Sequence, residues 1–109
     1  MSWLVRDGDV LAAAEVASSA HDRRRGLLGR ESFAGALVLR PCRNVHTARM
    51  RFPIDVAFCD VNGLVLRTCS LAPARVSPVV WRAAFALEAG AGAFDRWRLE
   101  AGDRVELRG

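Results

Sequence analysis

The sequence predicts a single α+β domain built mainly on an antiparallel β-sheet. Short runs with alternating apolar side chains recur along the chain, and two of them, residues 54–59 and 64–69, flank a sequence suited to a hairpin turn. One segment, beginning at Ser19, carries a clear helix-start signal. Several strands with one clear helix are typical of an α+β domain. The length of 109 residues fits one domain over residues 1–109.

The N-terminal part predicts two strands followed by a helix. Residues 3–6 and 10–18 suit strands around an Asp-Gly-Asp turn, although the alanines of the second segment also suit a helix. Ser19 is followed three positions later by Asp22, a spacing close to that of a capping box. We expect the helix to run up to Gly29, a residue suited to the left-handed conformation that closes a helix.

The middle of the chain predicts a short strand and then a stretch interrupted by prolines. Residues 36–39 form an apolar run typical of a buried strand, which Pro41 ends. Residues 45–50 fit either another strand or an extended edge. Pro53 lacks an amide donor, so it belongs at the start of a strand or at a sheet edge.

The hairpin permits a prediction of register. Bringing the two apolar faces together requires Asp60 to pair with Leu64, which leaves a three-residue loop that ends in Gly63. Glycine is the residue required there, because such a loop closes with a left-handed bulge. Continuing this register places Cys69 opposite Asp55 and predicts no disulfide between the strands.

The same register predicts an ion pair. Arg67 lies diagonal to Asp55 and within reach of its carboxylate, so we expect Asp55 to pair with Arg67 or with Arg51. Glu88, inside a largely apolar stretch, is likewise expected to be the structural partner of an arginine.

The C-terminal third is less distinctive. Residues 81–89 fit a helix or a strand, residues 91–99 a short helical turn, and residues 105–107 a final strand.

Charge and composition narrow the classes of function. The chain has 16 basic and 12 acidic residues, a net charge of +4, and every basic residue is an arginine. The arginines are dispersed apart from Arg23–Arg25 and accompany no nucleic-acid recognition motif, so nucleic acid is not the expected partner. No apolar run approaches the ~20 residues that span a bilayer and no leader pattern opens the chain, so we expect a cytoplasmic protein. The three cysteines are an odd number and are expected to be reduced thiols there.

Several motifs occur in an order that matches a known family. They are Pro-Cys-x-x-Val-His-Thr and Met-Arg-Phe-Pro-Ile-Asp-Val in residues 41–56, Arg-x-x-Gly-Leu-Leu-Gly-Arg in 23–30, Asp-Val-Asn-Gly in 60–63, Leu-Glu-Ala-Gly in 87–90 and Gly-Asp-Arg-Val in 102–105. This set resembles the small bacterial and archaeal family known as domain of unknown function 192. The resemblance implies a compact, barrel-like sheet with one or two short helices, and a strand in residues 81–89. It also points to a protein partner, such as a component of a secretion or pilus system, but implies no particular activity.

The candidate site lies in the proline-bounded stretch after residue 41. His46 stands there among arginines, and guanidinium groups suit bidentate capture of a carboxylate or phosphate. If these groups converge with Arg30, the site would favour a small anion. We therefore predict a non-catalytic binding module for a small anion or a protein partner. The predicted ligand-binding residues are His46, Arg49, Arg51, Asp55, Arg30 and Arg43.

The alternative is a small enzyme that uses His46. Its partner would be the Cys42 thiol, as a nucleophile, or the Asp55 carboxylate, as the group that orients the imidazole. Neither pairing forms a complete catalytic set in the sequence. A structural zinc site usually needs four ligands in paired short spacings, so neither a metal nor another cofactor is expected.

Overall fold

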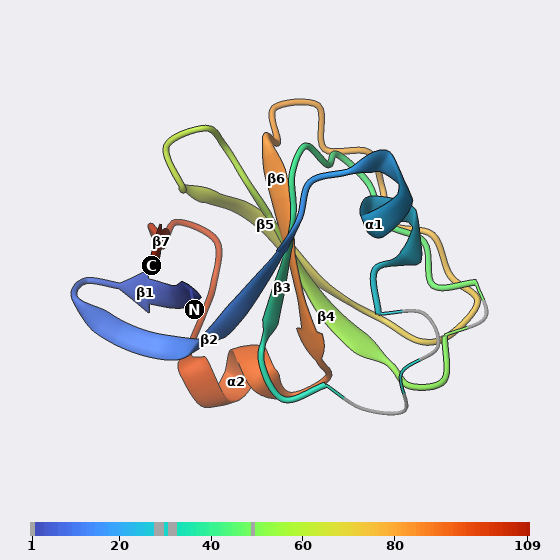
Figure 1. Cartoon of the computed structure of the whole chain (residues 1–109), viewed down its shortest axis with the longest axis horizontal. Helices are drawn as coiled ribbons and strands as arrows, with labels where there is room; N and C mark the ends of the chain where they lie inside the picture. Colours follow the sequence, from blue (N-terminus) through green and yellow to red (C-terminus); the bar gives the residue numbers. More distant parts are fainter. Residues whose placement is uncertain (1, 28–29, 31–32, 49) are drawn as a thin grey trace.

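The protein folds around one twisted sheet, with one short helix near the upper ends of its strands and another near their lower ends in the view of Figure 1. The structure is a computed structural model that describes residues 2–27, 30, 33–48 and 50–109. In chain order the elements are β1 (Ser2–Arg6), β2 (Asp9–Ala17), α1 (Ala20–Arg25), β3 (Ala36–Leu39), β4 (Ile54–Cys59), β5 (Val65–Leu71), β6 (Phe85–Gly90), α2 (Ala93–Trp97) and β7 (Glu106–Arg108).

The sheet has seven strands in the order β5-β4-β6-β3-β2-β1-β7. Its pairs are antiparallel except for β2 and β3, which are parallel, so the predicted α+β class with a mostly antiparallel sheet is confirmed. The barrel-like closure is not confirmed. An isolated bridge joins Leu64, just before β5, to Arg104, just before β7. Within the described residues, however, no ladder joins the two edge strands β5 and β7.

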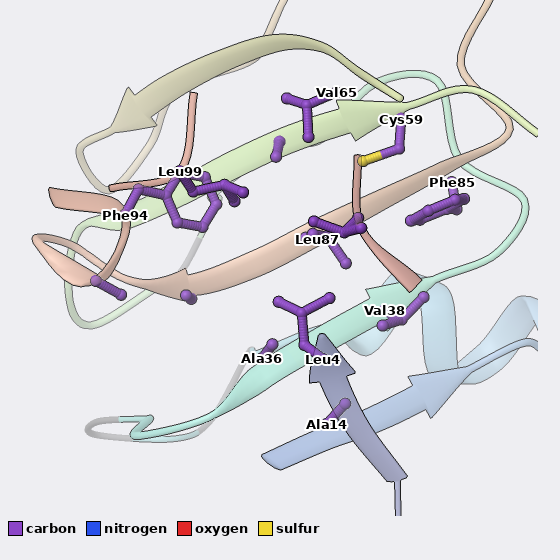
Figure 2. Packing of buried hydrophobic residues seen from close by; sticks show 14 residues of the cluster. Leu4, Ala14, Ala36, Val38, Cys59, Val65, Phe85, Leu87, Phe94 and Leu99 are labelled. Carbon is purple, nitrogen blue, oxygen red and sulfur yellow. The ribbon is translucent and has the colours of Figure 1, made fainter. Parts of the chain in front are cut away.

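The two faces of the sheet carry separate apolar clusters. The first cluster includes Leu4, Val38 and Leu87, with Phe94 of α2 packed against them (Figure 2). The second cluster includes Leu27, which follows α1, and Phe58 of β4. Because successive residues of a strand point to opposite faces, neighbouring side chains on the central strands serve different clusters.

The hairpin turn between β4 and β5 forms as predicted. The amide of Asp60 donates to the carbonyl of Leu64 at 3.0 Å, and Gly63 has a φ of +83°. A Cβ on Gly63 would collide with the Val105 carbonyl oxygen, so glycine is needed for close approach as well as for the turn.

The predicted register also holds for the next pair, Cys59 with Val65, but it is wrong for the rest of the hairpin. A bulge between Phe58 and Cys59 shifts the pairing by one residue, which places Cys69 opposite Val56 and Ser70 opposite Asp55. A single inserted residue moves every later pair, because side chains alternate between faces.

Helix α1 begins where the sequence predicted. The Ser19 hydroxyl accepts a hydrogen bond from the amide of Asp22 at 3.0 Å. The helix ends earlier than expected, at Gly26 with a φ of +48°, and Gly29 lies outside the described residues. None of the helices in the described part of the chain is long and apolar enough to cross a membrane.

The remaining predicted elements have mixed outcomes. Residues 9–17 form a strand rather than a helix, and the strand expected in residues 81–89 is confirmed but begins only at Phe85. The helical turn in residues 91–99 is α2. The described part of residues 45–50 forms no extended strand, since its β-pairing is limited to one bridge from His46 to Val76.

Candidate functional site

A small cavity lies between the end of α1 and residues 44–50, over the face of the sheet that carries the second cluster. Its volume is about 60 Å³. The cavity combines basic side chains, an imidazole and a buried carboxyl group. It is lined by Arg23, Arg24, Arg25, Gly26, Leu27, Asn44, Val45, His46, Ala48, Met50 and Glu88.

The last turn of α1 supplies the positive charge of this pocket. Arg23, Arg24 and Arg25 form that turn, and all three line the cavity. The Arg23 guanidinium donates to the Ser18 carbonyl at 2.6 Å, which fixes its position, while Arg24 and Arg25 are exposed. The carbonyl end of a helix carries partial negative charge, but in a six-residue helix three full positive charges dominate.

The described part of residues 44–50 forms the opposite wall, and hydrogen bonds to the loop before β6 hold it in place. The Thr47 side chain is fully buried, and its hydroxyl donates to the Ala72 carbonyl at 2.7 Å. The Thr47 amide donates to the Arg75 carbonyl at 2.8 Å. Val45 and Thr47 are both buried, whereas His46 between them is exposed and lines the pocket.

Glu88 of β6 supplies the only carboxyl group among the residues that line the pocket. Glu88 is 4% exposed. Within the described part of the chain, no hydrogen bond or ion pair involves its carboxyl oxygens. The expected ion pair with an arginine is therefore not found. Burial disfavours the charged form and raises the pKa of the Glu88 carboxyl to about 7. The group is thus poised between acid and carboxylate near neutral pH.

The end of α1 closes tightly over this carboxyl group. A Cβ built on Gly26 would lie 3.1 Å from Glu88 Oε1, so the backbone passes beside the acid where any larger residue would press on it. Gly26 also has a positive φ, a conformation that favours glycine. The sequence therefore folds α1 so that its arginines and the β6 acid meet in one pocket.

Of the predicted catalytic candidates, His46 lines the pocket and Cys42 lies beside it. The Cys42 thiol donates to the Asn44 carbonyl at 3.1 Å and packs against the second cluster. Burial raises the pKa of this thiol, and the negative charge of Glu88 acts in the same direction. A raised pKa leaves less thiolate at neutral pH, which is the opposite of an activated nucleophile.

Asp55 is not brought together with His46. Its side chain lies between α2 and β5, on the face that carries the first cluster. There it accepts hydrogen bonds from the Ser70 hydroxyl at 2.7 Å and from the amides of Gly92 and Phe94 at 3.0 and 3.1 Å. These donors replace the predicted arginine partner, because the bulge places Ser70 opposite Asp55. Asp55 fixes the start of α2.

The predicted arginines do not gather around His46 as a group. Arg30 forms an exposed ion pair with Glu15 at 2.9 Å, in a different hollow of the surface. Arg43 and Arg51 are exposed and do not line the pocket, and Arg49 lies outside the described residues.

Sequence reasoning missed the pocket arginines and the role of Glu88. The signal was a carboxylate within an apolar strand together with a run of arginines at a helix end. Among the described residues, no group of three His, Cys, Asp or Glu side chains is arranged to hold a metal ion.

Fold and pocket together define a small α+β domain with a polar cavity on one sheet face. The sequence profile of domain of unknown function 192, described as "Uncharacterized ACR", matches residues 3–107. The chain therefore belongs to this family. No curated protein matches it.

Two solved structures are similar in fold. One is a protein of unknown function from Novosphingobium aromaticivorans, with a TM-score of 0.82 and 19% identity, matched over 96% of this chain and 82% of the other. The second is described as a "putative transcription regulator" from Sinorhizobium meliloti, with a TM-score of 0.78 and 23% identity, matched over 96% of this chain and 90% of the other. At these identities the likeness concerns the fold alone.

Proposed function

We propose that the protein is a small non-catalytic binding module whose ligand is a small anion held in the pocket between α1 and residues 44–50. One observation carries this proposal: three arginines and His46 line the same cavity. Guanidinium groups bind carboxylates and phosphates through paired hydrogen bonds, and a positive rim disfavours a cationic ligand. The site therefore differs from the predicted one in its arginines but keeps His46.

Alternatives gain less support from the geometry. An enzyme based on His46 would need Cys42 or Asp55, but burial raises the pKa of the Cys42 thiol, and Asp55 lies on the other face of the sheet. The description of the Sinorhizobium protein raises nucleic acid as a ligand. We do not extend it to this chain, whose dispersed arginines accompany no recognition motif.

A cytoplasmic location stays part of the proposal. The three cysteines are free thiols in the structure, as expected for a reducing compartment. A protein partner from a secretion or pilus system remains a prediction from the family resemblance.

The anion site can be tested by thermal unfolding of wild type with sodium phosphate and with sodium acetate, at ionic strength held constant with sodium chloride. A ligand at ten times its Kd stabilises the folded state by about 1.4 kcal/mol, which raises the Tm of a domain of this size by about 6 °C. We expect this shift for at least one anion in wild type. The double variant Arg24→Gln/Arg25→Gln should lose most of it.

The matched control is Arg75→Gln/Arg82→Gln. It removes the same net charge from two exposed arginines that do not line the pocket. This control should keep the wild-type shift, because a specific site responds to local charge rather than to net charge. Equal losses in the two double variants, or no anion effect on wild type, would refute the site.

A further inference from the structure

The Glu88 carboxyl group has no role in a simple anion site, yet it faces the same cavity as the arginines. The residue is 4% exposed, its carboxyl oxygens keep a small contact with the cavity, and its pairing partners on the neighbouring strands, Leu37 of β3 and Val56 of β4, are apolar. An ionised carboxylate in such surroundings costs several kcal/mol unless it is paired. A buried acid with no partner among the described residues points to a ligand that supplies one.

The charged and titratable groups around Glu88 come from three segments. Arg23, Arg24 and Arg25 face the cavity from α1, and His46 faces it from residues 44–50. Cys42, in the loop after β3, is near enough for its thiol to be affected by the charge of Glu88. Positive charge thus surrounds the mouth of the pocket, while an acid forms part of its inner wall.

An anion entering this pocket would meet Glu88 as well as the arginines. Against ionised Glu88 the two negative charges repel one another in a site of low polarity. Against protonated Glu88 the same anion gains a short O–H···O⁻ hydrogen bond, one of the stronger kinds in proteins. Protonation of Glu88 therefore converts an obstacle to anion binding into a contact.

The small volume of the cavity favours a small buried group. The cavity of about 60 Å³ exceeds the roughly 10–15 Å³ that holds one water molecule, so a group of several heavy atoms can enter it. A carboxylate, with three heavy atoms in one plane, needs less of this space than a phosphate with five. The remainder of such a ligand would lie outside, over the exposed arginines.

Resting on the anion-binding function proposed above, we infer that the pocket takes a carboxylate head group together with one proton, and that protonated Glu88 donates a hydrogen bond to one of its oxygens. Binding then consumes one proton whenever Glu88 begins ionised, and no covalent bond changes. The carboxylate belongs either to a free small acid or to the C-terminus of a peptide. Both present the same group to Glu88.

The test measures binding by NMR titration of the ¹⁵N-labelled full chain at pH 5.5 and pH 8.5, at constant ionic strength. The probes are acetate, phosphate, and one tetrapeptide of small neutral residues with either a free or an amidated C-terminus. With the Glu88 pKa at about 7, raising the pH should weaken carboxylate binding to wild type by up to about 30-fold. Tighter binding of the peptide with a free C-terminus than of acetate identifies a peptide terminus as the better ligand. Tighter binding of acetate identifies a small acid as the better ligand. The inference predicts that one of these two results is observed.

Variants separate the contribution of Glu88 from that of His46, which lines the same cavity. In Glu88→Gln the carboxylate affinity should change less than about threefold between the two pH values, because the amide does not titrate. In His46→Gln most of the pH dependence should remain. Loss of the pH dependence in His46→Gln and its survival in Glu88→Gln would overturn the inference.

A measurement on wild type alone avoids any effect of substitution on folding. The ¹³C shift of the Glu88 carboxyl carbon reports its titration directly, and saturating acetate should raise its pKa by at least one unit. Anion binding with an unchanged Glu88 titration refutes the proton-linked contact but leaves the anion site standing. Absence of binding by every probe at both pH values refutes the anion site itself.

Discussion

Two buried acids on neighbouring strands show how differently one sheet can treat the same functional group. Asp55 of β4 and Glu88 of β6 are each 4% exposed, and they point to opposite faces. Asp55 accepts three hydrogen bonds, two of them from backbone amides that open α2. The Glu88 carboxyl group faces a cavity and has no hydrogen-bond partner in the described part of the chain.

The difference separates a structural acid from a candidate functional one. A carboxylate that already accepts several hydrogen bonds is stabilised in its charged form and has little capacity left for a ligand. A carboxyl group held beside open space keeps that capacity, at a cost to the stability of the fold. Burial alone did not distinguish the two residues, whereas the number of donors did.

Removing the satisfied acid should have the largest effect on stability. Asp55→Ala deletes three hydrogen bonds and leaves the amides of Gly92 and Phe94 without an acceptor. We therefore expect a loss of about 4 kcal/mol in the free energy of unfolding. Urea denaturation measures this loss. Ser70→Ala removes only one donor and should cost about 1 kcal/mol. Equal small losses in both variants would contradict the structural role of Asp55.

The unsatisfied acid should appear instead in the pH dependence of stability. The folded protein holds the Glu88 proton up to a pKa of about 7, whereas the unfolded chain releases it near 4.5. Between these values the native state binds more protons, so its stability falls as the pH rises. Relative to Glu88→Gln, wild type should lose about 3 kcal/mol from pH 4.5 to pH 7 and then level off.

This comparison is made by urea denaturation of wild type and Glu88→Gln across that pH range. Subtracting the free energy of unfolding of Glu88→Gln from that of wild type at each pH removes, to first order, the contribution of the other titrating groups. A difference that stays constant between pH 4.5 and pH 7 would mean that Glu88 titrates normally, and the contrast with Asp55 would fail.

A smaller effect should come from the backbone that passes beside Glu88. Gly26→Ala places a side chain 3.1 Å from the carboxyl oxygen and forces a positive φ on alanine, so we expect a loss of about 2 kcal/mol. Gly8→Ala is the matched control, because Gly8 also has a positive φ but has open space around its Cβ position. It should cost about 1 kcal/mol, as measured by urea denaturation.

The contact itself is isolated by combining Gly26→Ala with Glu88→Ala. Removing the carboxyl group should make Gly26→Ala less costly than it is in wild type, by several tenths of a kcal/mol. Strict additivity of the two losses would show that the backbone and the acid do not press on one another.

The parts of the fold that could be predicted are those in which local chemistry and pattern agree. Ser19 carries its capping hydroxyl in the sequence, and Gly63 satisfies a turn that the alternating strands also require. The register beyond Cys59 was predicted incorrectly because β4 is buried along its whole length. Both of its faces are covered, so apolar alternation could not reveal the bulge after Phe58.

The site was harder to predict because its parts are distant in sequence. Residues 23–26, His46 and Glu88 meet only when α1 and the loop after β3 both cover the face of β6 to which Glu88 points. The local pattern of apolar residues does not predict that these distant segments lie side by side. The sequence did indicate His46, since an imidazole among arginines stands out, whereas Asp55 stood out equally and proved to be part of the fold.

The contacts between β1 and the C-terminal part of the chain have a consequence for biosynthesis. Arg6 of β1 donates to the carbonyls of Trp97 and Arg98 and pairs with Asp103, and β7 completes the other side of β1. The Gly63 carbonyl accepts from Val105 at 2.9 Å. During synthesis β1 can pair with β2 early, but its other edge stays unpaired until β7, about a hundred residues later in the chain, has been made.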